Sequence, residues 1–206
     1  MALGNFGIKE VADVRFYNTD DVTYDAAAGT LTVTAAKPEL EFTTLKVSNL
    51  EFTAEQSEAR GGKGNAPLII WDYGREVNIT LEDALLSVDC MKAMFGNTGA
   101  NKGITIGAGT FPGNYAVIGV TFARDQETGD DHLFTFYVPN AKVGSEITLT
   151  MEAEGDPTVF SMNLRALRKS KTDDTMVALI PADAKYTKGE TETSLFDQVV
   201  TVSTQN

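Results

Sequence analysis

Apolar and polar residues alternate over much of the chain, which is the pattern of β-strands that bury one face. Leu31 and Val33 alternate with threonines, and the preceding segment 25–29 ends in a glycine that favours a turn. Segment 40–54 predicts a long strand whose alternation slips near residues 48–49, which indicates a bulge or bend. Further strands are predicted over residues 68–73, 75–80, 104–111, 115–124, 132–139, 147–154, 159–168, 176–180 and 195–202.

Two pairs of these segments predict antiparallel hairpins. Segments 147–154 and 159–168 flank a Gly-Asp-Pro turn and carry matching apolar and polar parities. Segment 115–124 is apolar on both parities, which predicts a central strand covered on both faces. We expect it to pair with segment 132–139 across the acidic turn 125–131. The last strand, 195–202, could pair within the subunit or with a neighbour.

One helix is predicted over residues 81–95, with Thr80 as N-cap and Gly96 at the C-terminal end. A first apolar face is expected to pack on the sheet; its residues are Leu81, Ala84, Leu85, Val88, Met91 and Phe95. A second stripe lies nearly opposite and consists of Leu86, Cys90 and Ala93. Two interpretations of that stripe stay open: scattered apolar surface, or a contact with a neighbouring subunit.

Residues 55–67 interrupt the strand pattern with glycines, a proline and no large apolar side chain, which predicts a mobile loop or arm. A polar stretch predicts a second, C-terminal arm over residues 185–206. The whole chain, 1–206, is expected to form a single mainly β domain. The expected fold is an antiparallel β sandwich or barrel with one packed α-helix.

Charge narrows the possible partners. The 206 residues carry 17 Lys and Arg against 29 Asp and Glu, a net charge of -12. Such a surface repels nucleic acid and anionic lipid, so direct DNA binding is not expected. Residues 1–14 lack a signal-peptide pattern, and no stretch approaches the roughly 20 apolar residues that span a bilayer. These features predict a protein made in a cytoplasm, with no membrane partner.

The sequence contains few residues of the types that carry out nucleophilic catalysis or bind metal ions. The chain holds one histidine, His132, and one cysteine, Cys90. A nucleophilic triad would depend on His132, which is better explained as a surface residue at a turn. A zinc site needs about four nitrogen or sulfur ligands, and the acidic turn lacks the spacing of a calcium loop. The glycines after Arg60 lack the Lys-Ser/Thr pair of a phosphate loop. We therefore expect no enzyme, metal or cofactor.

Several segments of the chain together resemble a known protein family. The order LKVSNLEFTAE (45–55), ARGGKGN (59–65), LIIWDYGREV (68–77) and LEDAL (81–85) resembles tail-tube proteins, the major tail proteins of tailed bacteriophages. The segment GDPTVF (155–160) resembles them too. No catalytic motif anchors the likeness.

The resemblance implies a structural virion protein located in the tail. Such proteins self-assemble into hexameric rings that stack into a tube, and strands from each subunit form a continuous barrel around the lumen. DNA passes without specific binding, and the partners are other copies of the chain and other tail proteins. A loop reaching the adjacent ring is then expected to include Glu55, Glu58, Arg60, Gly61, Gly62, Lys63 and Asn65. The lumen-facing candidates are Glu76, Asn78, Thr150 and Glu152.

Two other classes of function remain as alternatives. A β-sandwich binding or adhesion module would show an exposed aromatic platform, for which Trp71 and Tyr73 are the only hint; both are expected in a core strand. Another ring-forming virion component, such as a head-tail joining protein, would share the same sequence features.

Overall fold

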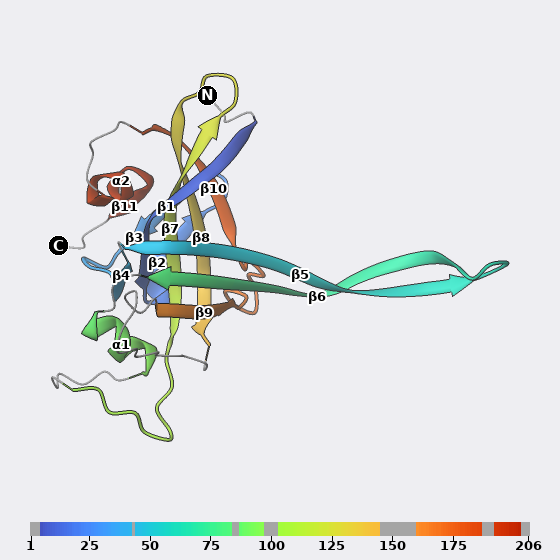
Figure 1. Ribbon diagram of the computed structural model, residues 1–206, viewed down its shortest axis with the longest axis horizontal. Helices are drawn as coiled ribbons and strands as arrows, with labels where there is room; N and C mark the ends of the chain where they lie inside the picture. The colour runs from blue at the N-terminus through green and yellow to red at the C-terminus, as the bar shows by residue number, and fades with distance from the viewer. Residues whose placement is uncertain are drawn as a thin grey trace, which may run out of the picture.

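Two β-sheets make up most of the molecule in the computed structural model, which describes residues 5–42, 44–83, 87–96, 103–144, 160–186 and 192–202 (Figure 1). The larger sheet has eight strands in the order β4-β1-β7-β8-β9-β6-β5, with β10 paired to β8 beside this path. The smaller sheet has the order β11-β3-β2. The strands of the larger sheet are β1 (Phe6–Tyr17), β4 (Leu40–Phe42), β5 (Leu45–Gly61), β6 (Ala66–Asp83), β7 (Asn114–Asp125), β8 (Asp131–Val143), β9 (Phe160–Ala166) and β10 (Ala178–Lys185).

The central hairpin is the pair predicted from the sequence. Strands β7 and β8 pair antiparallel from Arg124↔Asp131 at the turn to Asn114↔Lys142 at the far end. All residues in the middle of both strands, 116–123 and 133–139, are buried, so the prediction of a centre covered on both faces is confirmed. On β7, Val117 packs into one core, while Ile118 and Val120 pack into the other.

Strand β1 runs along the free edge of β7 and was not predicted. In its sequence, Asp13 and Arg15 stand between apolar residues, so the alternation of buried and exposed positions is hard to recognise. Both charged residues are buried, and Arg15 Nε lies 3.0 Å from the Asp13 carboxylate. The pair explains why a strand with charges on one face can lie inside the fold.

The other edge of β8 is shared. Strand β10 pairs with the half of β8 near the turn, and β9 pairs with residues 141–143. Strand β9 confirms most of the predicted segment 159–168, and β10 begins within the predicted segment 176–180. The predicted partner 147–154 of the Gly-Asp-Pro hairpin lies outside the described residues. The predicted segment 104–111 is described in full and forms no strand.

The smaller sheet covers the second core. It consists of β2 (Val22–Asp25), β3 (Thr30–Val33) and β11 (Val200–Val202), with a short 3-10 helix, η1 (Thr19–Asp21), before β2. Strand β11 pairs parallel with β3, and helix α2 (Glu192–Val199) precedes it. The late segment 195–202 is therefore mostly helical, and its short strand pairs within the subunit. Phe196 of α2 is fully buried, and the guanidinium of Arg15 stacks on its ring at 4.0 Å.

Helix α1 is shorter and oriented differently from the prediction. It spans Val88–Met94, and the hydroxyl of Ser87, not Thr80, caps it by accepting the backbone N–H of Cys90. Residues 81–83 continue β6 instead. Cys90 and Met94 face the first core, whereas Val88 of the expected packing face is exposed. The choice of packing face was therefore wrong.

These elements give the mainly β, antiparallel sandwich that the sequence predicted, with two apolar cores on the two faces of the central strands. The larger sheet curls so that β5, at one edge, contacts β1 next to the other edge. Among the described strands, the edge strands β4 and β5 do not pair, so the sheet stays open.

Candidate functional site

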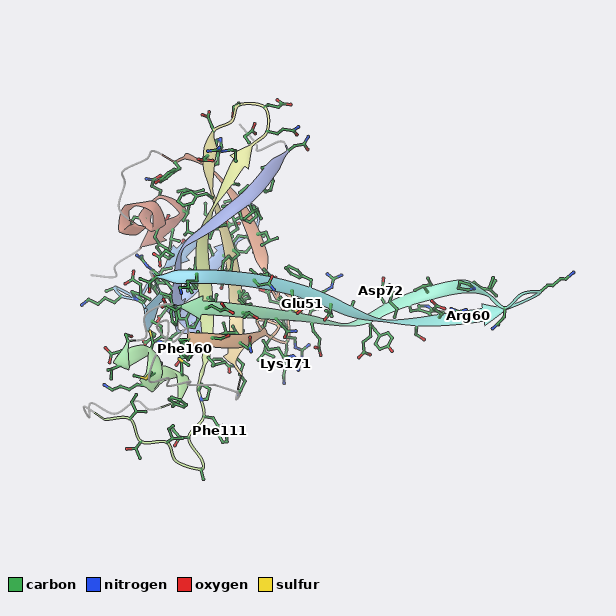
Figure 2. All side chains as sticks on the ribbon, viewed as in Figure 1. Glu51, Arg60, Asp72, Phe111, Phe160 and Lys171 are labelled. Atoms are coloured by element: carbon green, nitrogen blue, oxygen red, sulfur yellow. The ribbon has the colours of Figure 1, made fainter. Side chains whose placement is uncertain are left out.

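A long two-stranded arm is the most distinctive feature of the chain. Strands β5 and β6 contain 17 and 18 residues, and they pair from Leu45↔Asp83 in the body to Gly61↔Ala66 at the tip. Figure 1 shows the hairpin running out of the body to one side as a twisted ribbon. Figure 2 shows Glu51 at its root, with Asp72 and Arg60 farther out. The segment predicted as a mobile loop is thus two strands and a four-residue turn, because backbone pairing continues where side-chain burial ends.

A β-bulge at the root of the arm exchanges the faces of β6. Thr53 pairs with Glu76 and Glu55 pairs with Tyr73, so β6 has one more residue than β5 between these pairs. Gly74 supplies the conformation, with φ of +61°, which L side chains rarely adopt. Side chains alternate along a strand, so the extra residue moves the odd-numbered residues of β6 to the other face. In the body the odd-numbered residues of β6 point into the core. In the arm they lie on the face that continues the outer face of the body.

One face of the arm is consequently an apolar ladder, which we define as Ile69, Trp71 and Tyr73 with Ala59 of the paired strand. Ile69 pairs with Ala59, and Trp71 pairs with Ser57. Trp71 is 52% exposed, and Ile69 and Tyr73 are exposed to a similar degree. The prediction that Trp71 and Tyr73 lie in a core strand is wrong, because the arm extends beyond the body; Ile70 on the opposite face is exposed to the same degree.

The opposite face of the arm carries more polar side chains, although Ile70 is also exposed there. The Gln56 side-chain amide donates to the Asp72 carboxylate at 2.8 Å, and Arg60 Nε donates to Glu58 at 2.7 Å. Arg60 therefore already has a carboxylate partner on its own strand. At the tip, Gly62 and Asn65 have positive φ and close the turn around Lys63. All seven residues expected in the reaching loop lie on this arm, from Glu55 near its root to Asn65 at its tip.

The lumen-facing candidates that can be located lie on the outer face of β6. Glu76 and Asn78 are partly exposed there, and Arg165 of the neighbouring β9 donates to the Glu76 carboxylate. This face therefore mixes acidic and basic side chains. Thr150 and Glu152 lie outside the described residues.

The proposed helix interface is only partly located. Leu86 lies outside the described residues, and Ala93 is partly buried against the first core. Cys90 is 4% exposed and packs inside that core, so it cannot contribute an exposed contact in this conformation. Burial raises the pKa of its thiol.

A groove beside the root of the arm exposes a second apolar surface. It has a volume of about 270 Å³ and lies between β5 and strands β1, β7, β8 and β10. Ile8, Phe52 and Leu179 line it, and each is more than half exposed. The arm ladder and this groove are surfaces of the same chemical character on one chain.

Side chains that could bind a metal ion do not cluster in the described part of the chain. Within those ranges, no three His, Cys, Asp or Glu side chains are placed to hold a metal ion. His132 is the second residue of β8, next to Asp131 and beside the turn where the sequence placed it. Among the described residues, no helix has the length and apolar character needed to cross a membrane.

Comparison with known protein families identifies the architecture. The model of the YomU/Tube protein family matches residues 6–103 and 92–180, which together include the arm and the central hairpin. The chain belongs to the YomU/Tube protein family. This is a family of phage tail tube proteins, so the resemblance found in the sequence is confirmed. No protein with a curated description matches the chain.

Membership in the YomU/Tube family makes the chain a phage tail tube protein and a component of the virion tail. The family is a structural one, which suggests a role without catalysis. For such a protein the surfaces that contact other copies are the functional site. In the described residues, the arm is the part that extends farthest from the body (Figure 1).

Proposed function

We propose that this chain self-assembles into stacked hexameric rings that form the tube of a phage tail, through which DNA passes without specific binding. One observation carries the proposal: the arm exposes large apolar side chains where its own chain has no body to cover them. Leu68, Ile69, Ile70, Trp71 and Tyr73 are each more than half exposed.

The low stability expected of an isolated hairpin supports the idea that a partner covers the arm. A two-stranded hairpin without further packing is marginally stable in water. A concentrated apolar surface on a soluble chain marks an interaction site or an aggregation liability. A second copy that covers the ladder removes both problems, and the apolar groove at the arm root offers a surface of matching character on each body.

The outer face of β6 is the proposed lumen side. Glu51, Glu76 and Asn78 lie on this face, which continues into the ladder face of the arm. The net charge of -12 repels the phosphate backbone and keeps passing DNA from adhering. Glu76 is held by Arg165, so the repulsion on this face is moderated rather than uniform.

An arm deletion tests the proposal. Residues 56–72 are replaced by Asn-Gly, which joins Glu55 to Tyr73, a pair already in register. The matched control replaces residues 62–65 by the same Asn-Gly and joins Gly61 to Ala66, the last pair of the arm. Both variants end in two-residue hairpin turns, but only the control keeps the ladder. Electron microscopy and sedimentation velocity follow assembly.

Stacked rings or tubes are expected from the intact protein and from the tip control, and folded monomers or single rings from the armless variant. An armless variant that forms tubes as the intact protein does would refute the role of the arm. An intact protein that stays monomeric at high concentration would refute self-assembly.

The exposed aromatics favour one other candidate. Trp71 and Tyr73 share a face two residues apart, as in a platform that stacks on a sugar ring. That function predicts a monomer whose tryptophan fluorescence changes with a carbohydrate ligand, and the sedimentation experiment separates it from assembly.

A further inference from the structure

The groove beside the root of the arm has the chemistry of a receptor for apolar side chains. Within the described ranges, no charged side chain lines it. Its two hydroxyl groups add little polar surface, because Thr121 is buried and the Ser48 oxygen is covered from solvent. The exposed surface of the groove comes mainly from Ile8, Phe52 and Leu179. A charged guest would lose its water here without gaining a partner, so an apolar guest is favoured.

The arm of the same chain does not fill this groove. Phe52 pairs with Val77 and lies on the core side of the sheet, whereas the ladder lies on the other face of the arm. Trp71 pairs with Ser57, which is five residues farther out on the continuous strand β5 than Phe52. Five residues of extended strand span roughly 17 Å. The ladder of one copy therefore faces away from its own groove and lies beyond its reach.

We infer that the groove receives Trp71 and the adjoining ladder residues from the arm of a second copy of this chain. The inference rests on the proposed self-assembly and names the surface that the arm contacts. Ladder and groove are different patches of one chain, so the contact is heterologous. Each copy inserts one arm and receives another, and the contact propagates in one direction from copy to copy.

The size of the contact indicates how it acts. Three ladder side chains, Ile69, Trp71 and Tyr73, and three groove side chains, Ile8, Phe52 and Leu179, are each more than half exposed. At about 100 Å² for each of them, the contact buries about 600 Å² of apolar surface. Stable interfaces begin at roughly 1,200 Å², so one contact holds two subunits only weakly. Several arms that engage one neighbouring ring at the same time act together, which makes weak contacts sufficient for stacking.

The fluorescence of the protein reports directly on this contact, because Trp71 is the single tryptophan of the chain. As the concentration rises into the range of assembly, its emission should shift to shorter wavelength and acrylamide should quench it less. Leu179→Lys places a charge in the groove at an exposed position. This variant should lack the shift and should need about a tenfold or higher concentration to assemble. Ser161→Lys adds the same charge at an exposed position of β9 and should behave as the intact chain does.

Thiol cross-linking between two proteins tests which surfaces meet. One protein carries Ser57→Cys on the ladder face of the arm, and the other carries Leu179→Cys in the groove and a mass tag. Cys90 is buried, so the intact chain serves as the blank. A short bismaleimide should join one copy of each protein in preference to two copies of the same protein. Gln56→Cys lies on the opposite face of the arm, and in place of Ser57→Cys it should give several-fold less product.

Equal cross-linking from the two faces of the arm would overturn the inference, and so would an unshifted tryptophan emission in the assembled intact protein. A chain with both Ser57→Cys and Leu179→Cys that cross-links only within itself would assign the groove to its own arm, which also overturns it. Normal tubes from Leu179→Lys would overturn the contact and leave tube formation standing. If the intact chain forms no tubes but the two proteins still cross-link preferentially to each other, the contact stands and the tube function falls.

Discussion

Truncation of the exposed indole on the arm isolates the contribution of the apolar ladder to assembly. In Trp71→Ala the backbone pairing with Ser57 is retained, and the side chain removed has no partner on the body. A surface substitution of this kind changes folding stability by about 0.5 kcal/mol or less. The free energy of unfolding should therefore match that of the intact chain, while association weakens.

The expected magnitude follows from the exposed area. An indole side chain has about 250 Å² of surface to bury. Trp71 is 52% exposed, which leaves about 130 Å² for a partner to cover. At about 25 cal/mol per Å² this area corresponds to about 3 kcal/mol. Binding recovers only part of such a value, so a loss of about 1–3 kcal/mol is expected. That is about a 5- to 150-fold rise in the concentration needed for assembly.

Sedimentation velocity over a concentration series measures this shift, with chemical denaturation as the folding control. Gln56→Ala is the matched variant, because it shortens a side chain at a similar distance along the arm on the opposite face. It should assemble within about twofold of the intact chain. Equal assembly by Trp71→Ala and the intact chain would show that the ladder is not buried in the assembly. A similar loss in both variants would point to the whole arm rather than to one face.

Other expectations concern the body. Burial raises the pKa of Tyr137 to about 12, so the folded state holds this proton more tightly than the unfolded state. The contribution of this group to the free energy of unfolding is therefore fully present below pH 10, and about 2–3 kcal/mol should be lost between pH 10 and 12 in denaturant titrations. Tyr137→Phe should flatten that fall. Gly119→Ala places a methyl group within 2.1 Å of the Phe136 ring and should lower the free energy of unfolding by about 1–3 kcal/mol, with an unchanged Tm as the contrary result. Phe196→Ala should cost about 3–5 kcal/mol in the same assay, because the ring is fully buried against the second core; a loss under 1 kcal/mol would mean that α2 is not anchored there. Cys90 should react with a thiol reagent only at the rate of unfolding, and rapid labelling of the native protein would contradict its burial in the first core.

A continuous apolar run made the centre of the fold predictable. Segments with apolar residues on both parities, such as the one around Val117 and Ile118, need cover on both faces wherever they occur. Strand β1 was not predicted because the Asp13–Arg15 pair puts charges at buried positions, and charged residues usually mark an exposed face. The helix was extended too far back because residues 81–83 suit both structures. Pairing with β9 decides in favour of the strand there.

The arm shows a different limit of sequence analysis. Its glycines and charges suggested a loop, since pattern analysis detects side-chain burial and the arm has little. Backbone hydrogen bonds hold its strands together, and these leave no trace in residue types. The seven loop candidates lie on β5 and on the turn that joins it to β6. The aromatic residues were assigned to the core because an apolar strand pattern does not show where a hairpin leaves the body, and the bulge at Gly74 was missed because the predicted phase slip lies near residues 48–49.

Continuity of β5 and β6 through body and arm determines how the molecule withstands force. A pull on the tip runs along the strands, whereas the hydrogen bonds between antiparallel strands lie across them. From Asn78↔Arg165 to Asp83↔Phe160, the β6–β9 ladder must therefore yield in shear, with its bonds strained together rather than opened one by one. Tension that reaches a subunit through its arm is thus delivered to the interior of the sheet and not to a hinge.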